Sequence, residues 1–188
     1  MKSQYIKIST EIIEEIEKVI KDFDDTRLNE LMEELLIKKR IFITGVGRTG
    51  MIMKSFAMRL MHLGLKVFVT GEINTPSINK DDLMIVGSGS GETSTLVALS
   101  EKAKKLGVKI VLFTINDSST MGEIATTKIT ISATSPKLIK KNNFHSIQPM
   151  GALFEQSLMI TLDTLIIMLM EKLKVKSEKM FENHANLE

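Results

Sequence analysis

Residues 87–93, GSGSGET, carry the strongest chemical signal in the chain, because they join an apolar run of strand type to a helical pattern. Glycine lets a backbone turn tightly and approach a ligand closely. The N–H groups of a first helical turn attract an anion, and hydroxyl side chains add further donors. The loop therefore predicts a site for a small phosphate ester, and a turn without a ligand is the alternative. The expected binding residues here are Ser88, Gly89, Ser90 and Thr93.

A second glycine loop, residues 45–50, has the sequence GVGRTG and fits the pattern GxGxxG. Glu72 follows at roughly the spacing of a ribose-binding acid, so a dinucleotide site is an alternative here. The chain has no second half to complete a six-stranded dinucleotide domain, and such a site leaves the hydroxyl-rich loop unexplained. The pattern GxxxxGK[ST] is absent from the hydroxyl-rich loop, which excludes a nucleoside-triphosphate loop there.

Apolar runs of strand type alternate with helical patterns, which indicates parallel βαβ units. We expect a three-layer α/β/α sandwich with a five-stranded parallel sheet, preceded by N-terminal helices. Ligands of such folds bind at the carboxyl ends of the strands, where both glycine loops lie. We expect one domain with a helical segment (1–38), an α/β core (39–174) and a tail (175–188). Strands are expected at 40–44, 66–69, 83–86, 108–114 and 128–132, and core helices that end near 63, 106 and 174.

The composition argues against several classes of function. The net charge is +2 with basic and acidic residues interspersed, and aromatic residues make up 5%, so neither a basic nucleic-acid footprint nor stacking platforms are expected. The chain has no cysteine, which removes disulfides, a thiolate nucleophile and Cys-ligated metal. The histidines have no HxxxH spacing, so no metal site is predicted; they are His62, His145 and His184.

Neither a signal peptide nor a membrane span is expected. The first 17 residues are charged and amphipathic, without an apolar h-region. The most apolar segment, 150–169, contains Glu155 and Asp163, and its longest unbroken apolar run covers only 165–170. We therefore interpret this segment as too short for a span and expect a cytoplasmic protein that does not bind membranes.

The two loops together resemble those of the SIS (sugar isomerase) domain family, which binds phosphosugars at both positions. Four further segments are similar to the 6-phospho-3-hexuloisomerase branch of this family, and the resemblance covers essentially the whole chain. The resemblance implies a flavodoxin-like sheet and a homo-oligomer, either a dimer or a tetramer. The matching segments are GRTGMIMKSFAMRLMHLG, NDSSTMGE, QPMGALFEQS and the ending NHANLE.

The implied reaction interconverts D-arabino-hex-3-ulose 6-phosphate and fructose 6-phosphate. It belongs to formaldehyde assimilation or detoxification by the ribulose monophosphate route, or runs in reverse to supply pentose. Moving the ketone from C3 to C2 requires removal of the C2 proton and protonation of C3 through a cis-enediol(ate). One carboxylate can carry that proton without a metal or a redox cofactor, so no cofactor is expected.

The resemblance assigns the catalytic base to Glu155, which matches the glutamate of the LFEQ segment. Its apolar neighbours Leu153, Phe154 and Leu158 would partly desolvate the carboxylate, which favours a role as a base. The alternative is an ordinary glutamate in a first helical turn. The resemblance also implies that the C-terminal tail packs into a neighbouring subunit's site, where His184 would handle hydroxyl and ring oxygens. A frayed tail is the alternative.

Arg48, with Gly47, is expected to bind the substrate from the first loop. A guanidinium there can reach the phosphate or polarise a carbonyl or enediolate oxygen, whereas the alternative is a surface arginine at a helix start. Glu92 is interpreted as an acid at the N-terminus of its helix. His62 and Arg59 are expected to support the site indirectly or to lie at an interface, without an assigned role, and His145 is placed in a loop at the rim.

Two other functions stay open, namely a different SIS isomerase, acting on a heptose or an amino sugar, and a phosphosugar sensor without catalysis. A DNA-binding regulator is disfavoured, because the segment before Arg40 forms two acidic amphipathic patterns without a basic recognition helix. The 13 methionines are interpreted as core or subunit contacts.

Overall fold

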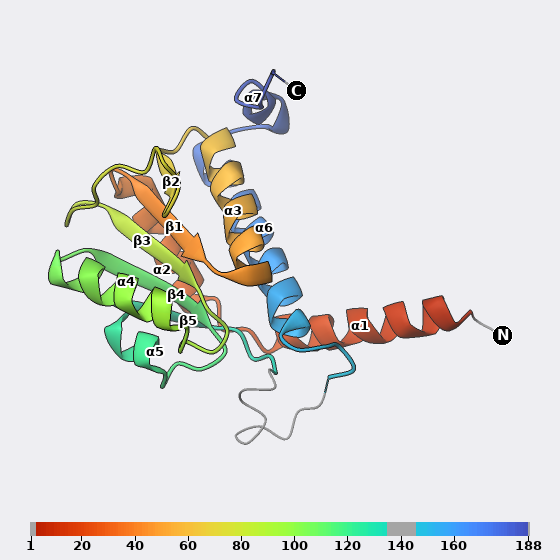
Figure 1. Cartoon of the computed structure of the whole chain (residues 1–188). Coiled ribbons are helices and arrows are strands. Elements are labelled where there is room, and N and C mark those ends of the chain that lie inside the picture. Colours follow the sequence, from red (N-terminus) through yellow and green to blue (C-terminus); the bar gives the residue numbers. More distant parts are fainter. Residues whose placement is uncertain (1–2, 135–145, 188) are drawn as a thin grey trace.

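Five parallel strands form the central layer of the protein, in the order β2-β1-β3-β4-β5 (Figure 1). The computed structural model describes residues 3–134 and 146–187. Helices lie on both faces of the sheet, which confirms the expected three-layer α/β/α sandwich. The strands are β1 (Ile41–Gly45), β2 (Val67–Val69), β3 (Leu83–Gly87), β4 (Lys109–Thr114) and β5 (Thr127–Thr130).

The order of the strands in the sheet reverses direction between β1 and β3, and ligand sites of this fold class lie at such a reversal. The chain runs outward from β1 to β2 and then crosses back to β3, so the helices that follow β1 and β3 lie on opposite faces. Such a switch point leaves a crevice at the carboxyl ends of the two strands. The register pairs Gly45 with Gly87, so both glycine loops start at the same level of the sheet.

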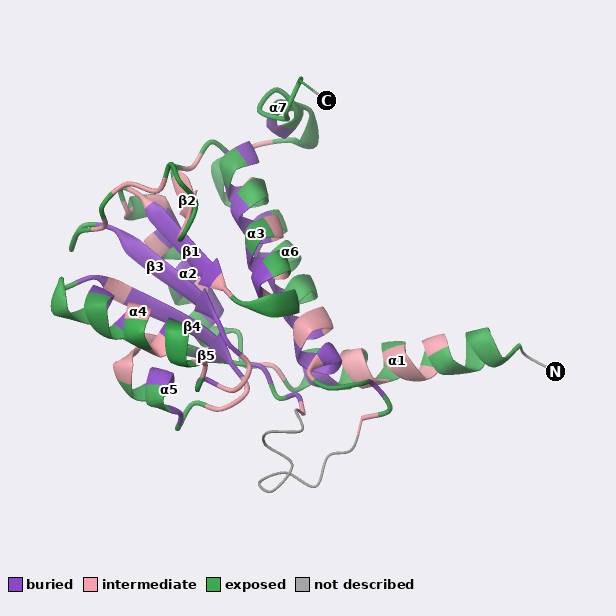
Figure 2. Ribbon diagram, in the orientation of Figure 1, coloured by how far each residue is buried: buried purple, intermediate pink, exposed green. Residues whose placement is uncertain are grey.

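Two apolar cores explain why the helices adopt these positions. One face of the sheet packs against α2, α3 and α6, whose buried residues include Leu31, Phe56 and Leu162. The other face packs against α4 and α5, with Leu96 and Met121 buried. Figure 2 shows the central strands β1, β3 and β4 buried between these layers. The helices are α1 (Gln4–Lys21), α2 (Thr26–Ile37), α3 (Gly47–His62), α4 (Ser94–Lys105), α5 (Thr120–Ile124), α6 (Ala152–Leu173) and α7 (Ser177–Phe181).

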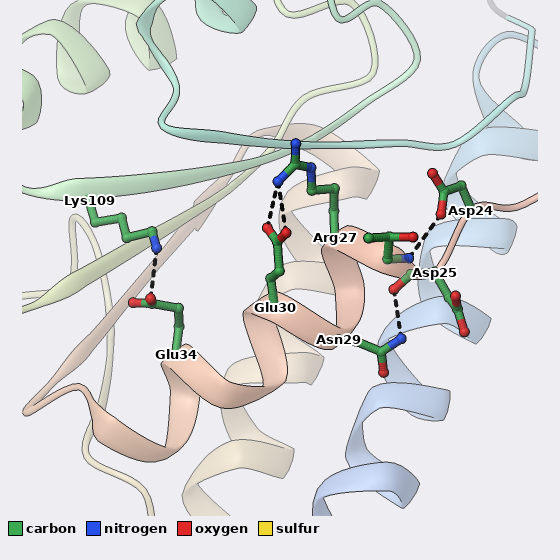
Figure 3. Close-up of polar contacts among 8 residues, drawn as sticks. Asp24, Asp25, Arg27, Asn29, Glu30, Glu34 and Lys109 are labelled. Atoms are coloured by element: carbon green, nitrogen blue, oxygen red, sulfur yellow. Dashed lines mark hydrogen bonds and ion pairs between the residues drawn. The ribbon is translucent and has the colours of Figure 1, made fainter.

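Helix α2 is fixed at both ends by polar contacts (Figure 3). The Asp24 carboxylate accepts a hydrogen bond from the N–H of Thr26, the first residue of the helix, at 3.0 Å. Near its other end, Lys109 Nζ at the start of β4 lies 2.7 Å from Glu34 Oε1. This ion pair ties the N-terminal helices to the sheet.

Helix α6 is the most apolar element, with a mean hydropathy of 1.6 in its most apolar 18-residue window. Among the described residues it is the one helix whose length and composition would allow a membrane crossing, although the sequence pattern had been interpreted as too short. Half of that window is buried inside the protein. Its buried residues, among them Leu158, Leu162 and Leu165, belong to the core cluster that also contains residues of α3 and the sheet, so α6 is a core helix of this fold.

Helix α1 leaves the body of the protein and extends away from it (Figure 1). Ser3 caps it by accepting a hydrogen bond from the Ile6 N–H. Val19 is its one buried residue in the structure as described, while Tyr5 and Ile13 are 79% and 64% exposed. The helix therefore carries apolar surface that its own chain does not cover.

Two boundaries near the C-terminus differ from the sequence-based expectation. The most apolar segment of the sequence starts at 150, but the last long helix begins at Ala152, because Met150 has a positive φ of 57° and Gly151 stands at the N-cap without helical geometry. The tail expected at 175–188 contains the short helix α7, whose Met180 is buried against the core.

Candidate active site at the carboxyl ends of β1 and β3

The first glycine loop allows α3 to start directly against β1. A Cβ on Gly50 would lie 2.6 Å from the Gly45 carbonyl oxygen, so only glycine permits this approach of helix to strand. Gly47 has a φ of +63°, a left-handed conformation that glycine adopts freely. No side chain caps the start of α3 at Val46. The first-turn N–H groups therefore face the crevice without a capping side chain.

Glu72, the acidic residue that the dinucleotide alternative requires, is engaged in an ion pair in the structure. Glu72 Oε1 lies 2.7 Å from Lys54 Nζ on α3, in an exposed ion pair. The glycines of GVGRTG are explained by the packing of α3 on β1, and the sheet has five strands in the described residues. The pattern therefore needs no dinucleotide to account for it.

The second glycine loop is held by its own hydroxyls and by the end of β4. Ser88 is buried, and its N–H donates to the Phe113 carbonyl at 2.9 Å while its Oγ accepts from the Gly91 N–H at 3.2 Å. Ser90 Oγ accepts from the Glu92 N–H at 3.3 Å. Thr93 is the N-cap of α4, yet its side chain makes no capping bond. Ser88 thus holds the loop in shape, whereas Thr93 places its hydroxyl at the N-terminus of α4.

Gly91 shows how tightly the loop fits its neighbour. It has a φ of +67°, and a Cβ there would meet Ser119 Oγ at 1.9 Å. Ser119 itself caps α5 by accepting from the Gly122 N–H at 3.1 Å. The phosphate-loop candidate is therefore braced against the start of α5, a contact that no sequence motif indicated.

Glu92 serves a different helix from the one expected. Its carboxylate accepts from the Thr120 N–H at 2.9 Å and from the Thr120 hydroxyl at 2.8 Å, so it caps α5 rather than α4. The backbone N–H and then the hydroxyl of Thr120 hold the pKa of Glu92 below its usual 4.5. This corrects the interpretation of Glu92 as an acid for its own helix.

Glu155 and Arg48 meet across the crevice. Arg48 Nε lies 3.0 Å from Glu155 Oε2, and the side chain of Glu155 is 15% exposed whereas that of Arg48 is 57% exposed. Glu155 sits in the first turn of α6, and Arg48 in the first turn of α3. A carboxylate that is largely shielded from water but not fully buried is suited to proton transfer.

Phe154 brings the start of α6 onto the second glycine loop. A Cβ on Gly89 would lie 3.1 Å from Phe154 Cδ1, so the ring packs directly on the glycine backbone. Phe154 is buried. This contact places the next residue, Glu155, between the two glycine loops. The structure thus brings together Gly47, Arg48, Gly89 and Glu155, as the sequence analysis predicted for one site.

His184 does not reach this crevice within the chain. Its ring stacks on His62 with centroids 5.3 Å apart and on Phe181 at 5.5 Å. The neighbouring Asn183 Nδ2 donates to the His62 carbonyl at 2.9 Å. His62 ends α3 while Arg48 begins it, and a helix of 16 residues is about 24 Å long. A catalytic role for His184 therefore stays a prediction that requires a second subunit.

His62 has a structural role that sequence reasoning left open. It is buried, and the tail covers it. Burial above all, then the charges of Arg59 and His184, lower the pKa of His62 below its usual 6.5. The remaining histidine, His145, lies outside the described residues.

Glu15 anchors the segment that leads into α6, and the sequence offered no signal for it. Its carboxylate accepts from the Ser146 hydroxyl at 2.6 Å, from the Ile147 N–H at 2.9 Å and from Gln148 Nε2 at 2.9 Å. Burial raises the pKa of Glu15, but these hydrogen bonds outweigh burial and hold it below 4.5. We call this group the Glu15 clasp. It fixes the approach to α6 and with it the position of Glu155.

The chemistry available at the crevice is acid–base chemistry on an anionic ligand. One carboxylate faces the opening, one guanidinium lies beside it, and two uncapped helix starts supply N–H donors. Within residues 3–134 and 146–187, no three His, Asp or Glu side chains gather in a way that could hold a metal ion.

Comparison with known proteins places this arrangement in a family. The model of the SIS domain matches residues 34–160, a range that spans both glycine loops and Glu155. A 3-hexulose-6-phosphate isomerase of Bacillus subtilis is 43% identical over 178 residues, which covers 95% of this chain and 96% of that one. The chain belongs to the SIS domain family.

Other SIS relatives agree with this assignment along most of the chain. A 3-hexulose-6-phosphate isomerase of Mycobacterium gastri is 37% identical over 165 residues, covering 88% of this SIS protein and 82% of the relative. A crystal structure of a protein from Methanococcus jannaschii, from which a 3-hexulose-6-phosphate isomerase function was inferred, is 34% identical with a TM-score of 0.81. That match covers 99% of this chain and 100% of the other.

Proposed function

We propose that this SIS protein is a 3-hexulose-6-phosphate isomerase, which interconverts D-arabino-hex-3-ulose 6-phosphate and fructose 6-phosphate. The observation that carries the proposal is the shielded Glu155 carboxylate, paired with Arg48 and held over the second glycine loop. Near-full-length similarity to the isomerase of Bacillus subtilis selects this substrate pair among the SIS reactions.

The proposed reaction needs one proton carrier. Glu155 removes the proton from C2, and the electron pair of the C2–H bond forms the C2=C3 bond as the C3 carbonyl becomes an enediolate oxygen. The O2 proton moves to the C3 oxygen, which shifts the negative charge to O2. Glu155 then returns the carbon-bound proton to C3, and the O2 oxyanion becomes the C2 ketone of fructose 6-phosphate, with a hydroxyl on C3. A single carboxylate serves both steps because C2 and C3 are adjacent.

The phosphate is assigned to the second glycine loop. Thr93 at the uncapped start of α4 and Ser90 beside it supply hydroxyls, and the first-turn N–H groups of α4 point toward the same place. Ser88 contributes by holding the loop in shape through Gly91.

We further propose that the protein acts as a homo-oligomer, a dimer or tetramer, in the cytoplasm. Exposed apolar side chains on α1, α3 and α6 supply the surface, among them Tyr5, Met51 and Ile167. Assembly would bring the tail of one subunit to the crevice of another, where His184 would act. The setting is the ribulose monophosphate route of formaldehyde assimilation or detoxification, or pentose supply in reverse.

The test is fructose 6-phosphate formation from the hexulose phosphate made in situ by an aldolase from ribulose 5-phosphate and formaldehyde. The wild-type protein should convert it, and Glu155→Gln should lower kcat by a factor of about 100 to 10,000. Glu171→Gln, an exposed glutamate in the last turn of the same helix, is the matched control and should keep full activity.

Two outcomes would overturn parts of the proposal. Full activity in Glu155→Gln would remove Glu155 as the base. No conversion by the wild type, with sugar phosphate still bound, would point instead to another SIS substrate or to a sensor, which a panel of ketose and aldose phosphates would separate.

A further inference from the structure

Arg48 makes an ion pair that the stability of the fold does not explain. Its side chain is 57% exposed, and exposed pairs of this kind contribute little to folding. A positive charge in the first turn of α3 is also mildly unfavourable beside the helix dipole. The pairing with Glu155 therefore indicates a role in the site rather than in the fold.

The geometry limits which part of a sugar phosphate Arg48 can bind. Its Nε is committed to Glu155 Oε2 at 3.0 Å, and a guanidinium is a rigid planar fork of five N–H donors. An oxygen bound by the remaining donors therefore lies close to the Glu155 carboxylate. If Glu155 touches the C2 proton, the oxygens within that reach are those on C2 and C3.

In an extended substrate the phosphate lies away from this guanidinium. Phosphorus is five covalent bonds from C3, about 6 Å at ordinary bond lengths in an extended chain. The second glycine loop offers a separate place for the phosphate, with hydroxyls and helix N–H groups and without a lysine or arginine in residues 87–93. The two functions are thus divided between the loops.

We propose that Arg48 is a catalytic residue that binds the C2 and C3 oxygens and stabilises the cis-enediolate, while the phosphate is bound without it. This inference rests on the proposed function. As the proton moves from C2 to Glu155, the carboxylate becomes neutral and the negative charge appears on the enediolate oxygen. Arg48 lies between both positions, so it keeps an anionic partner throughout and stabilises the charge where it develops.

The test separates binding from catalysis in Arg48→Gln and Arg48→Lys. In Arg48→Gln, kcat should fall about 100- to 1,000-fold, with KM changed by less than about threefold because phosphate binding persists. Arg48→Lys should recover part of kcat, since it keeps the charge but loses the fork. Lys54→Gln removes a different exposed ion pair on the same helix and is the matched control, with normal activity expected.

The affinities for two ligands then show which group of the substrate Arg48 binds. A four-carbon aldonohydroxamate 4-phosphate, in which the hydroxamate carbon and nitrogen take the places of C3 and C2 of the enediolate, should lose affinity for Arg48→Gln by about the same factor as kcat. Inorganic phosphate should bind wild type and Arg48→Gln alike. An equal loss for both ligands, or a raised KM with an unchanged kcat, would place Arg48 on the phosphate and overturn the inference. Unchanged hydroxamate binding would overturn it as well.

Failure of the proposed function gives a different pattern. A wild-type protein that makes no fructose 6-phosphate contradicts the isomerase assignment, whereas an active wild type with an unaffected Arg48→Gln variant contradicts only the role of Arg48. Thermal unfolding of both variants within about 2 °C of wild type would verify that the exposed substitutions leave the fold intact.

Discussion

The two glycine loops occupy equivalent positions at the ends of β1 and β3, yet their residues do different work. In the first loop, Gly45 and Gly50 are needed because helix and strand touch through their backbones. In the second, the absence of a side chain on Gly91 leaves room for Ser119 of the next loop, and the Ser88 hydroxyl accepts a hydrogen bond from the loop backbone. Similar glycine spacing therefore serves the packing of a helix on a strand in one loop and a hydroxyl-rich backbone turn in the other.

The difference lies in the side chains between the glycines. The first loop carries one charged residue, Arg48, which forms an ion pair with Glu155. The second carries hydroxyls and Glu92, and Glu92 turns away to cap α5. The glycine pattern alone thus marks the two loops at the ends of β1 and β3. The residues between the glycines determine the chemistry available in each loop.

Breaking the packing glycine of the first loop should have the largest effect on the fold. Gly50→Ala places a Cβ 2.6 Å from the Gly45 carbonyl oxygen, and backbone cannot yield as a side chain does. We expect a loss of about 3 kcal/mol or more in the free energy of unfolding, measured by urea denaturation. Gly47→Ala is the control, because its Cβ meets nothing within 4 Å and only the left-handed strain of about 1–2 kcal/mol remains. Equal losses in the two variants would contradict the packing role.

Removing hydroxyls from the second loop should act on binding instead. Ser90→Ala and Thr93→Ala should each weaken phosphosugar binding by about 10- to 150-fold, the equivalent of about 1.5–3 kcal/mol for a hydrogen bond to a charged group. The midpoint of urea unfolding should stay near that of wild type. Ser118→Ala, exposed at the same edge of the sheet, is the control. Unaltered affinity in both variants would move the phosphate to another place.

Glu92 should produce the smallest effect and one that depends on pH. Its pKa is lower in the folded protein than its usual 4.5, so its contribution to stability is present above about pH 4.5 and is lost as the pH falls through the folded value. Because the carboxylate is exposed, Glu92→Gln should cost at most about 1 kcal/mol at pH 7, with kcat unchanged. Melting temperatures of wild type and variant should converge toward pH 3. A gap that stays constant with pH would contradict the capping role.

Most of the fold follows from patterns visible in the sequence. The apolar runs at 83–86 and 108–114 predicted strands, and β3 and β4 lie there, buried along nearly their whole length. The helix ends expected near 63 and 106 are confirmed by α3 and α4, and the glycines that follow, Gly64 and Gly107, have positive φ. Parallel topology then places both glycine loops at one edge of the sheet without further information.

The contacts within the site were less accessible to sequence reasoning. The pairing of Arg48 with Glu155 depends on how Phe154 seats α6 on Gly89, which is a matter of three-dimensional packing rather than of local pattern. Glu92 looked like an acid for its own helix, because the partner on α5 is distant in sequence. The position of His184 against His62 depends on the fold of the tail and on assembly.

The Glu15 clasp has a consequence for the order in which the protein matures. It joins residues 131 positions apart in the chain, and contacts at such separation form late because a long loop must close first. During synthesis, both glycine loops leave the ribosome well before the segment that Glu15 holds. The edge of the sheet that carries both glycine loops can therefore take shape on the nascent chain before Glu155 arrives, so under the proposed function enzymatic activity would mark the last stage of folding rather than the first.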